Sequence, residues 1–229
     1  MIGPQLRVCV VGDELVAGIG DPRALGWAGR VAVRTRTEED TPAVTVMPLG
    51  VTGEDSAGLR ERWHEESRRR WDPTAAPGQN RLVIGLGHAD AVAGLSLARS
   101  RLNLADVLDA ATQASIPVFV VGPPPPADPE LHPAVAELAH GWADVAQRRG
   151  VPFVDCFSPL VGHEQWFTDL ETEDGPTRST LPSNGHGGHA AAASSVRMPT
   201  VPGQVGYGLL AWLVLHGGWH RWCGITTTD

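Results

Sequence analysis

The chain has 229 residues, a formal net charge of −8 and no lysine, so all 18 of its basic residues are arginine. Without lysine it can form no lysine Schiff base, phosphate-binding-loop lysine or serine–lysine pair. Nucleic acids and anionic membranes bind proteins through a basic face. The acidic balance of this chain argues against such a face, so we expect neither partner. The cysteine count is three, with no CxxC pair, which favours a reducing compartment. With no signal peptide or membrane span recognisable in the sequence, we expect a soluble cytoplasmic protein.

Short apolar runs alternate along the chain with longer amphipathic stretches. In chain order they predict a strand at 7–11, a helix at 25–33, a strand at 44–49, a helix at 56–70, a strand at 82–86, a helix at 102–115, a strand at 117–121, a helix at 133–149, a strand at 151–155 and a helix at 203–216. Ser56 is the expected N-cap of its helix. The helical tryptophans Trp27, Trp63 and Trp212 are expected in the core. This alternation is typical of an open parallel sheet with helices on both faces.

Polar residues and glycines gather where these strands end. They are Gly12-Asp13-Glu14, Gly50, Gly87-His88-Ala89-Asp90 and Gly122-Pro123. In parallel α/β sheets, ligands bind outside the carboxyl ends of the strands. We therefore expect a small-molecule ligand at this edge. Residues 178–201 (RSTLPSNGHGGHAAAASSVRMPTV) have neither helical nor strand period and are predicted to form a long inserted loop.

Four segments at these positions resemble the sequence blocks of the SGNH (GDSL-type) hydrolases, over nearly the whole chain. VVGDELVAGIGD resembles the block that carries the family's nucleophilic serine, and LGVTGED the block whose glycine, here Gly50, supplies an oxyanion-hole amide. GLGHAD falls where the family has Gly-x-Asn-Asp. Asp174-Gly175 begins the last block, Asp-x-x-His-Pro-Gly, and PGQVGY completes it after the inserted loop. The resemblance implies one domain, residues 1–229, with a flavodoxin-like three-layer α/β/α fold and a five-stranded parallel sheet.

The family's catalytic residues are missing from their places. Glu14 stands where the resemblance places the serine, and Ala89 where it places the oxyanion asparagine. The histidine position is Thr177 or Val201, depending on which half of the split block is aligned. In serine-triad chemistry the histidine takes the serine proton, and losing one member costs several orders of magnitude in rate. We therefore do not expect esterase activity by the serine route.

Three interpretations remain open. The first is acid/base chemistry on a small acyl- or ester-type molecule, with Glu14 as general base, general acid or carboxylate nucleophile. Its candidate catalytic residues are Glu14, His88, Asp90, Asp174, His186 and His189, and its candidate substrate- or oxyanion-binding residues are Asp13 and Gly50. His88 and Asp90 share one side if their segment is extended, but not if it is a tight turn. A loop histidine returns to the pocket only if the loop folds over the strand ends.

The second interpretation is a metal site made by Glu14, His88, His186 and His189, a donor set that suits zinc or non-haem iron but has no recognisable ligand spacing. The third is a catalytically inactive scaffold that binds a ligand or accessory partner. The leading expectation needs no metal or cofactor.

Structural roles compete with these catalytic ones. Asp13 and Asp90 can brace turns by accepting backbone N–H groups. His88 can be a hydrogen-bonded structural residue, and His186 and His189 can be exposed loop residues. A cluster of acids this close should make at least one carboxyl hold its proton more firmly than usual, and Glu14 is the candidate.

Overall fold

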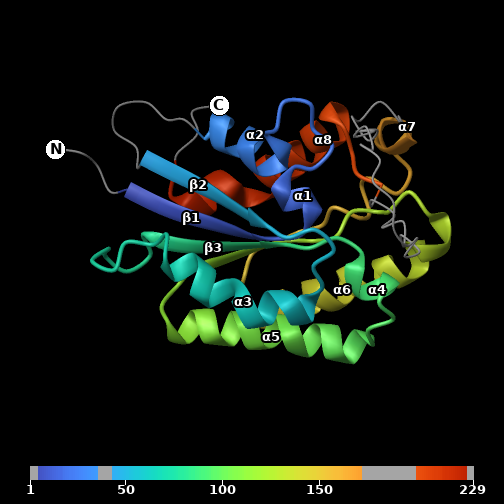
Figure 1. Cartoon of the computed structure of the whole chain (residues 1–229). Coiled ribbons are helices and arrows are strands. Elements are labelled where there is room, and N and C mark those ends of the chain that lie inside the picture. The colour runs from blue at the N-terminus through green and yellow to red at the C-terminus, as the bar shows by residue number, and fades with distance from the viewer. Residues whose placement is uncertain (1–4, 36–42, 172–199, 226–229) are drawn as a thin grey trace, which may run out of the picture.

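The computed structural model describes residues 5–35, 43–171 and 200–225. Within this part of the chain, five strands form one parallel sheet in the order β2-β1-β3-β4-β5 (Figure 1). The strands are β1 (Gln5–Gly12), β2 (Ala43–Gly50), β3 (Asn80–Gly85), β4 (Val118–Val121) and β5 (Phe153–Val154). Every strand predicted from an apolar run is confirmed, and so is the three-layer α/β/α class.

Helices connect the strands and cover both faces of the sheet. They are α1 (Glu14–Ala17), α2 (Gly26–Arg34), α3 (Ser56–Arg68), α4 (Ala89–Val92), α5 (Leu97–Gln113), the 3-10 turn η1 (Pro129–Leu131), α6 (His132–Gln147), α7 (Glu164–Glu171), α8 (Gln204–Val214), the π-helical turn η2 (Leu215–Trp219) and α9 (His220–Cys223). The helix predicted from residue 102 begins at Leu97, because Ser96 caps it by accepting the backbone N–H of Arg99 at 3.3 Å.

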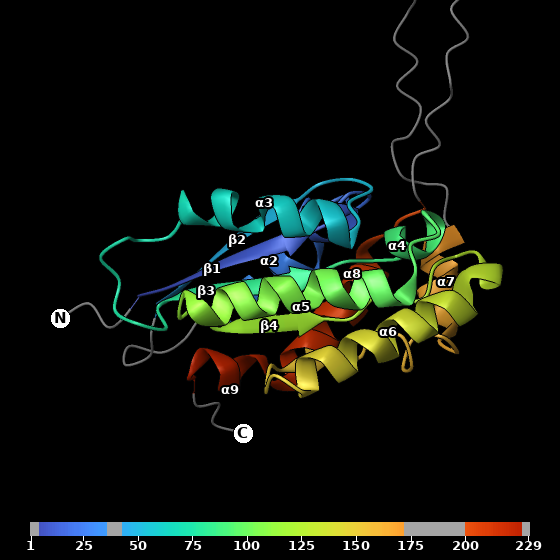
Figure 2. The ribbon, with the colours of Figure 1, turned by 90° about the horizontal axis from the view of Figure 1, so that it is seen from below.

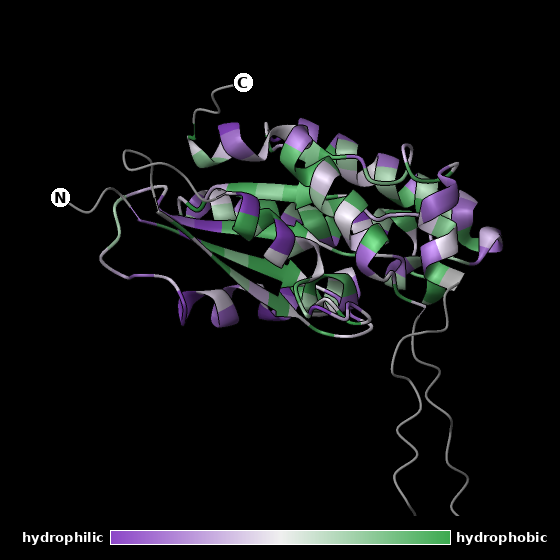
Figure 3. Ribbon diagram, turned by 90° about the horizontal axis from the view of Figure 1, so that it is seen from above, coloured by the Kyte–Doolittle hydropathy of each residue, from purple (hydrophilic) through white to green (hydrophobic). Residues whose placement is uncertain are grey.

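Two apolar cores lie on opposite faces of the sheet, as the side-chain alternation of a strand requires. In β1, Val8 and Val10 face the layer of α1, α2, α7 and α8, while Cys9 and Val11 face α3, α5 and α6. Figure 2 shows α3, α5 and α6 lying across one face of the strands, and Figure 3 shows the apolar strands enclosed by the helices. This sandwich leaves the ends of the strands as the place where polar side chains can gather.

One expectation about the core is wrong. Trp27 and Trp63 are buried, but Trp212 of α8 is 56% exposed and stacks on His216, with ring centroids 4.1 Å apart. Helix α8 is apolar on nearly every side, so its sequence does not specify which side faces outward.

Candidate functional site at the carboxyl ends of the strands

Three glycines lie at one level where the central strands end. Gly12 of β1 is in register with Gly50 of β2 and with Gly85 of β3. A Cβ on Gly12 would lie 1.7 Å from the carbonyl oxygen of Gly85, and one on Gly50 would lie 2.3 Å from the backbone nitrogen of Ala17. The missing side chains therefore allow α1 to lie directly against the ends of its neighbouring strands, and Figure 1 shows α1 and α4 at this same end of the sheet.

Asp13 is the buried N-cap of α1. Its carboxylate accepts the backbone N–H of Leu15 at 3.0 Å and that of Gly87 at 2.5 Å. The second bond ties the end of β1 to the turn after β3, so Asp13 braces these turns. Burial, and then the negative charge of Glu14, raise the pKa of Asp13 to about 8. The acid cluster was expected to raise the pKa of at least one carboxyl, and Asp13 is such a carboxyl.

Glu14 is the first residue of α1 and is only 6% exposed. Its Oε2 accepts the backbone N–H of Gly53 at 2.8 Å, across the turn that follows β2. Gly53 has a φ of +72°, in the left-handed region that glycine enters without strain. The sequence interpretation missed Gly53 and named Gly50, although both lie in the LGVTGED block. The oxyanion role of Gly50 stays a prediction, and the amide that meets the Glu14 carboxylate is that of Gly53.

His88 occupies the residue before α4 and is partly buried. Burial lowers the pKa of His88 below its ordinary value, while the negative charge of Glu14 opposes this effect. The imidazole therefore holds a proton less firmly than an exposed histidine, and Glu14 is close enough for its charge to act on the imidazole. The structure thus brings together two of the predicted acid/base residues.

Asp90 serves a different part of the molecule. One carboxylate oxygen accepts the backbone N–H of Ser56 at 2.7 Å, and the other accepts the hydroxyl of Ser100. The Ser100 oxygen in turn accepts the indole N–H of Trp142 at 2.9 Å. His88 and Asp90 lie at the start of α4 rather than on an extended segment, and Asp90 is directed to α3 and α5. Its hydrogen bonds match the turn-bracing alternative.

The predicted site residues Asp174, His186 and His189 lie outside the described residues, as does most of the 178–201 loop. The second half of the split block is described and lies beside the site. A Cβ on Gly20, in the turn after α1, would meet the Val201 side chain at 2.5 Å. The start of α8 is held by Asp169, which accepts the backbone N–H of Gly206 at 2.7 Å.

Among the described residues, no group of three or more His, Cys, Asp or Glu side chains is arranged to hold a metal ion. The metal hypothesis relied on two loop histidines outside that part of the chain, so it stays a prediction. In the same described ranges, no helix is both long and apolar enough to span a membrane.

The arrangement at the strand ends offers a partly buried imidazole with a lowered pKa and a buried carboxylate whose charge acts on it. A neutral imidazole can take a proton, and a nearby carboxylate stabilises the imidazolium that forms. These are the elements of acid/base chemistry. A hydroxyl nucleophile is absent from the position after Asp13, where Glu14 stands.

Solved structures similar to this chain support the same fold. The lipase/acylhydrolase from Enterococcus faecalis is 18% identical, with 95% of this chain and 97% of that chain covered and a TM-score of 0.66. The psychrotrophic esterase EstA from Pseudoalteromonas sp. is 15% identical, with coverage of 95% and 98% and a TM-score of 0.62. AlinE4, an SGNH-hydrolase family esterase, is 22% identical, with coverage of 72% and 82% and a TM-score of 0.58.

The sequence comparisons identify the family. No match was found among curated proteins. The model of the GDSL-like Lipase/Acylhydrolase family matches residues 10–193, most of the chain. The chain therefore belongs to the GDSL-like lipase/acylhydrolase family.

Proposed function

We propose that this family member acts on a small acyl- or ester-type molecule by acid/base chemistry, with Glu14 and His88 as the working pair. The observation that carries the proposal is a buried carboxylate, Glu14, whose charge acts on the partly buried imidazole of His88 at the carboxyl ends of the strands. Ligands of parallel α/β folds bind at this edge. The family supports a hydrolase fold, and the replacement of its serine by Glu14 requires a different route.

In this route water is the nucleophile. As its oxygen bonds to the acyl carbon, one proton passes to the imidazole of His88, and the charge of Glu14 stabilises the imidazolium. The proton then passes to the leaving alcohol oxygen as the C–O bond breaks. The products are a carboxylic acid and an alcohol, and no covalent enzyme intermediate forms.

The decisive variant is Glu14→Gln, which keeps an oxygen for the Gly53 amide but removes the charge. We expect it to lower kcat about 100-fold or more on any ester or thioester that the wild-type chain hydrolyses, since losing the carboxylate that stabilises a catalytic imidazolium can cost up to about 10⁴-fold in kcat. A panel of short-chain 4-nitrophenyl esters and acyl thioesters supplies the substrates. The matched control is Glu130→Gln, on the exposed turn η1.

The pH profile gives an independent check. Because burial lowers the pKa of His88, its base form persists below the ordinary value of about 6.5. The acidic limb of the kcat/KM profile should therefore lie below about pH 6.5. Unchanged turnover in Glu14→Gln, at any pH, contradicts the acid/base proposal.

A second candidate is a non-catalytic binding protein. Its supporting observation is that the strand-end carboxylates are already engaged internally, with Glu14 on Gly53, Asp13 on Leu15 and Gly87, and Asp90 on Ser56 and Ser100. Saturable binding of an acyl compound without turnover by the wild-type chain would favour this candidate.

A further inference from the structure

Arg62 of α3 binds several backbone segments at the strand ends. Its Nη2 donates to the carbonyl oxygens of Gly12 at 3.1 Å and of Leu49 at 2.9 Å. Its Nε and Nη2 also donate to the two carboxylate oxygens of Glu54, and its Nη1 pairs with Glu66 at 3.2 Å. The Arg62 side chain is 18% exposed and that of Glu54 is 4% exposed, so the interaction is shielded from water.

Gly12, Leu49 and Glu54, three of the partners of this guanidinium, are each next in sequence to a residue of the site. Gly12 precedes Asp13 and Glu14, and Leu49 precedes Gly50. Glu54 follows Gly53, whose N–H donates to the Glu14 carboxylate. One side chain from α3 therefore connects β1, β2 and the turn after β2 at the point where they build the site.

The chemistry of arginine suits this task. The guanidinium is planar and presents five N–H donors in a rigid fork, so it can bind a carboxylate and separate carbonyl oxygens at once. Lysine offers one compact charge and cannot reproduce this geometry. The two carbonyl oxygens lie at strand ends, where Arg62 supplies them with a donor.

We propose that Arg62 is the positioning residue of the Glu14 site, because its fork holds the ends of β1 and β2 and, through Glu54, keeps the Gly53 amide on the Glu14 carboxylate. This deepens the proposed function by naming what shapes the same site, but it rests on contacts that exist without substrate. Glu14 and His88 are the groups proposed to react, and Arg62 acts only through their surroundings.

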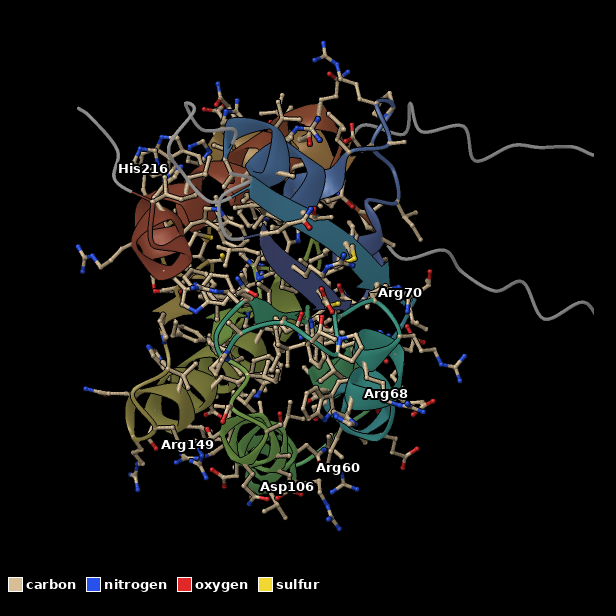
Figure 4. The ribbon with its side chains drawn as sticks, turned by 90° about the vertical axis from the view of Figure 1, so that its left-hand side faces the viewer. Arg60, Arg68, Arg70, Asp106, Arg149 and His216 are labelled. Atoms are coloured by element: carbon tan, nitrogen blue, oxygen red, sulfur yellow. The ribbon has the colours of Figure 1, made fainter. Side chains whose placement is uncertain are left out.

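The test compares Arg62→Met, which removes the fork, with Arg62→Lys, which keeps the charge alone. Arg60→Met is the matched control, because Arg60 lies on the same helix and forms a more exposed pair with Asp106 at 3.3 Å (Figure 4). Two readouts by NMR report on the site itself. They are the hydrogen exchange of the Gly53 amide and the pH titration of the His88 imidazole, measured well below the unfolding temperature of each variant.

We expect Arg62→Met and Arg62→Lys each to accelerate Gly53 amide exchange at least 10-fold. The pKa of His88 should move up towards its ordinary value, because a loosened turn admits water to the imidazole. Arg60→Met should change neither readout. If Arg62→Met does not fold, Arg62→Lys and Glu54→Gln give the same two readouts.

The positioning role is overturned if folded Arg62→Met or Arg62→Lys leaves Gly53 exchange and the His88 titration as in the wild type. It is equally overturned if Arg60→Met moves them as much. Neither readout measures turnover. A failure of the positioning proposal can therefore be distinguished from a failure of the acid/base proposal. Glu14→Gln can leave turnover unchanged while Arg62→Met still releases the Gly53 amide.

Discussion

Asp13 holds its proton more firmly in the folded chain than in the unfolded chain. Burial raises its pKa to about 8, whereas an unfolded aspartate has a pKa of about 3.9. Between about pH 4 and pH 8, the folded state therefore binds the proton and the unfolded state does not. By linkage, the free energy of unfolding falls as pH rises through this window, with a limiting slope of about 1.4 kcal/mol per pH unit for one proton.

Asp13→Asn should remove this contribution. We expect the variant to be less stable overall, by about 1–3 kcal/mol, because one of the two N–H groups at Asp13 loses its acceptor. Its stability should also fall less steeply than that of the wild type between pH 5 and pH 8. Urea unfolding at several pH values measures the difference, with Asp106→Asn on the surface of α5 as control. Parallel pH curves for Asp13→Asn and the wild type would contradict the raised pKa.

At the scale of single elements, two adjacent residues at the beginning of α3, Asp55 and Ser56, are both suitable N-caps. The sequence predicted Ser56 as the N-cap, but Asp55 holds that position and accepts the backbone N–H of Gly58 at 2.8 Å. Ser56 lies inside the helix, where its N–H donates to Asp90 and its hydroxyl accepts the side-chain amide of Asn103 at 2.9 Å. Aspartate and serine cap about equally well, so local propensity could not choose between them.

Replacing the true cap should cost stability in a defined way. We expect Asp55→Ala to lower the free energy of unfolding by about 0.5–2 kcal/mol, because the N–H of Gly58 loses its acceptor. Asp55→Asn keeps a side-chain oxygen and should retain most of the stability. Chemical denaturation of both variants tests the assignment. If Asp55→Ala and Asp55→Asn lower the free energy of unfolding equally, helix capping does not explain the contribution of Asp55.

At the scale of the whole molecule, one parallel sheet separates two cores that share the same strands. Leu108 of α5 is fully buried on one face, and Leu210 of α8 is 2% exposed on the other. Since both cores pack on the same five strands, losing either face should destabilise the same cooperative unit. Sites so separated, with no shared partner, usually contribute additively.

Leu108→Ala and Leu210→Ala should each lower the free energy of unfolding by about 2–5 kcal/mol. The double variant should lose the sum within about 0.5 kcal/mol. Unfolding in guanidinium, followed by tryptophan fluorescence, should remain one transition. Leu102→Ala, at a leucine of α5 that is 48% exposed, is the control and should change stability by less than about 0.5 kcal/mol. Two separate transitions would contradict the single cooperative unit.

The local hydrophobic pattern of the sequence was sufficient to predict the strands and the longer helices. The run RVCVV in β1 is apolar on both sides because both faces of the strand are buried, and this is visible without a structure. Short elements were missed, including α1 and α4, because four residues are too few to display a helical period. The polar residues at the strand ends were found because parallel strands place their ends at one edge.

By itself, the sequence determined the layered α/β architecture, the family resemblance and the residue types available at the strand ends, because these follow from local period and order. Only the tertiary structure decided where each side chain points. Glu14 meets the amide of Gly53, Asp90 turns to Ser56, and Arg62 reaches Gly12 and Leu49. These partners are far apart in the chain, and strand register and the packing of α3 bring them together. No local periodicity encodes those distances.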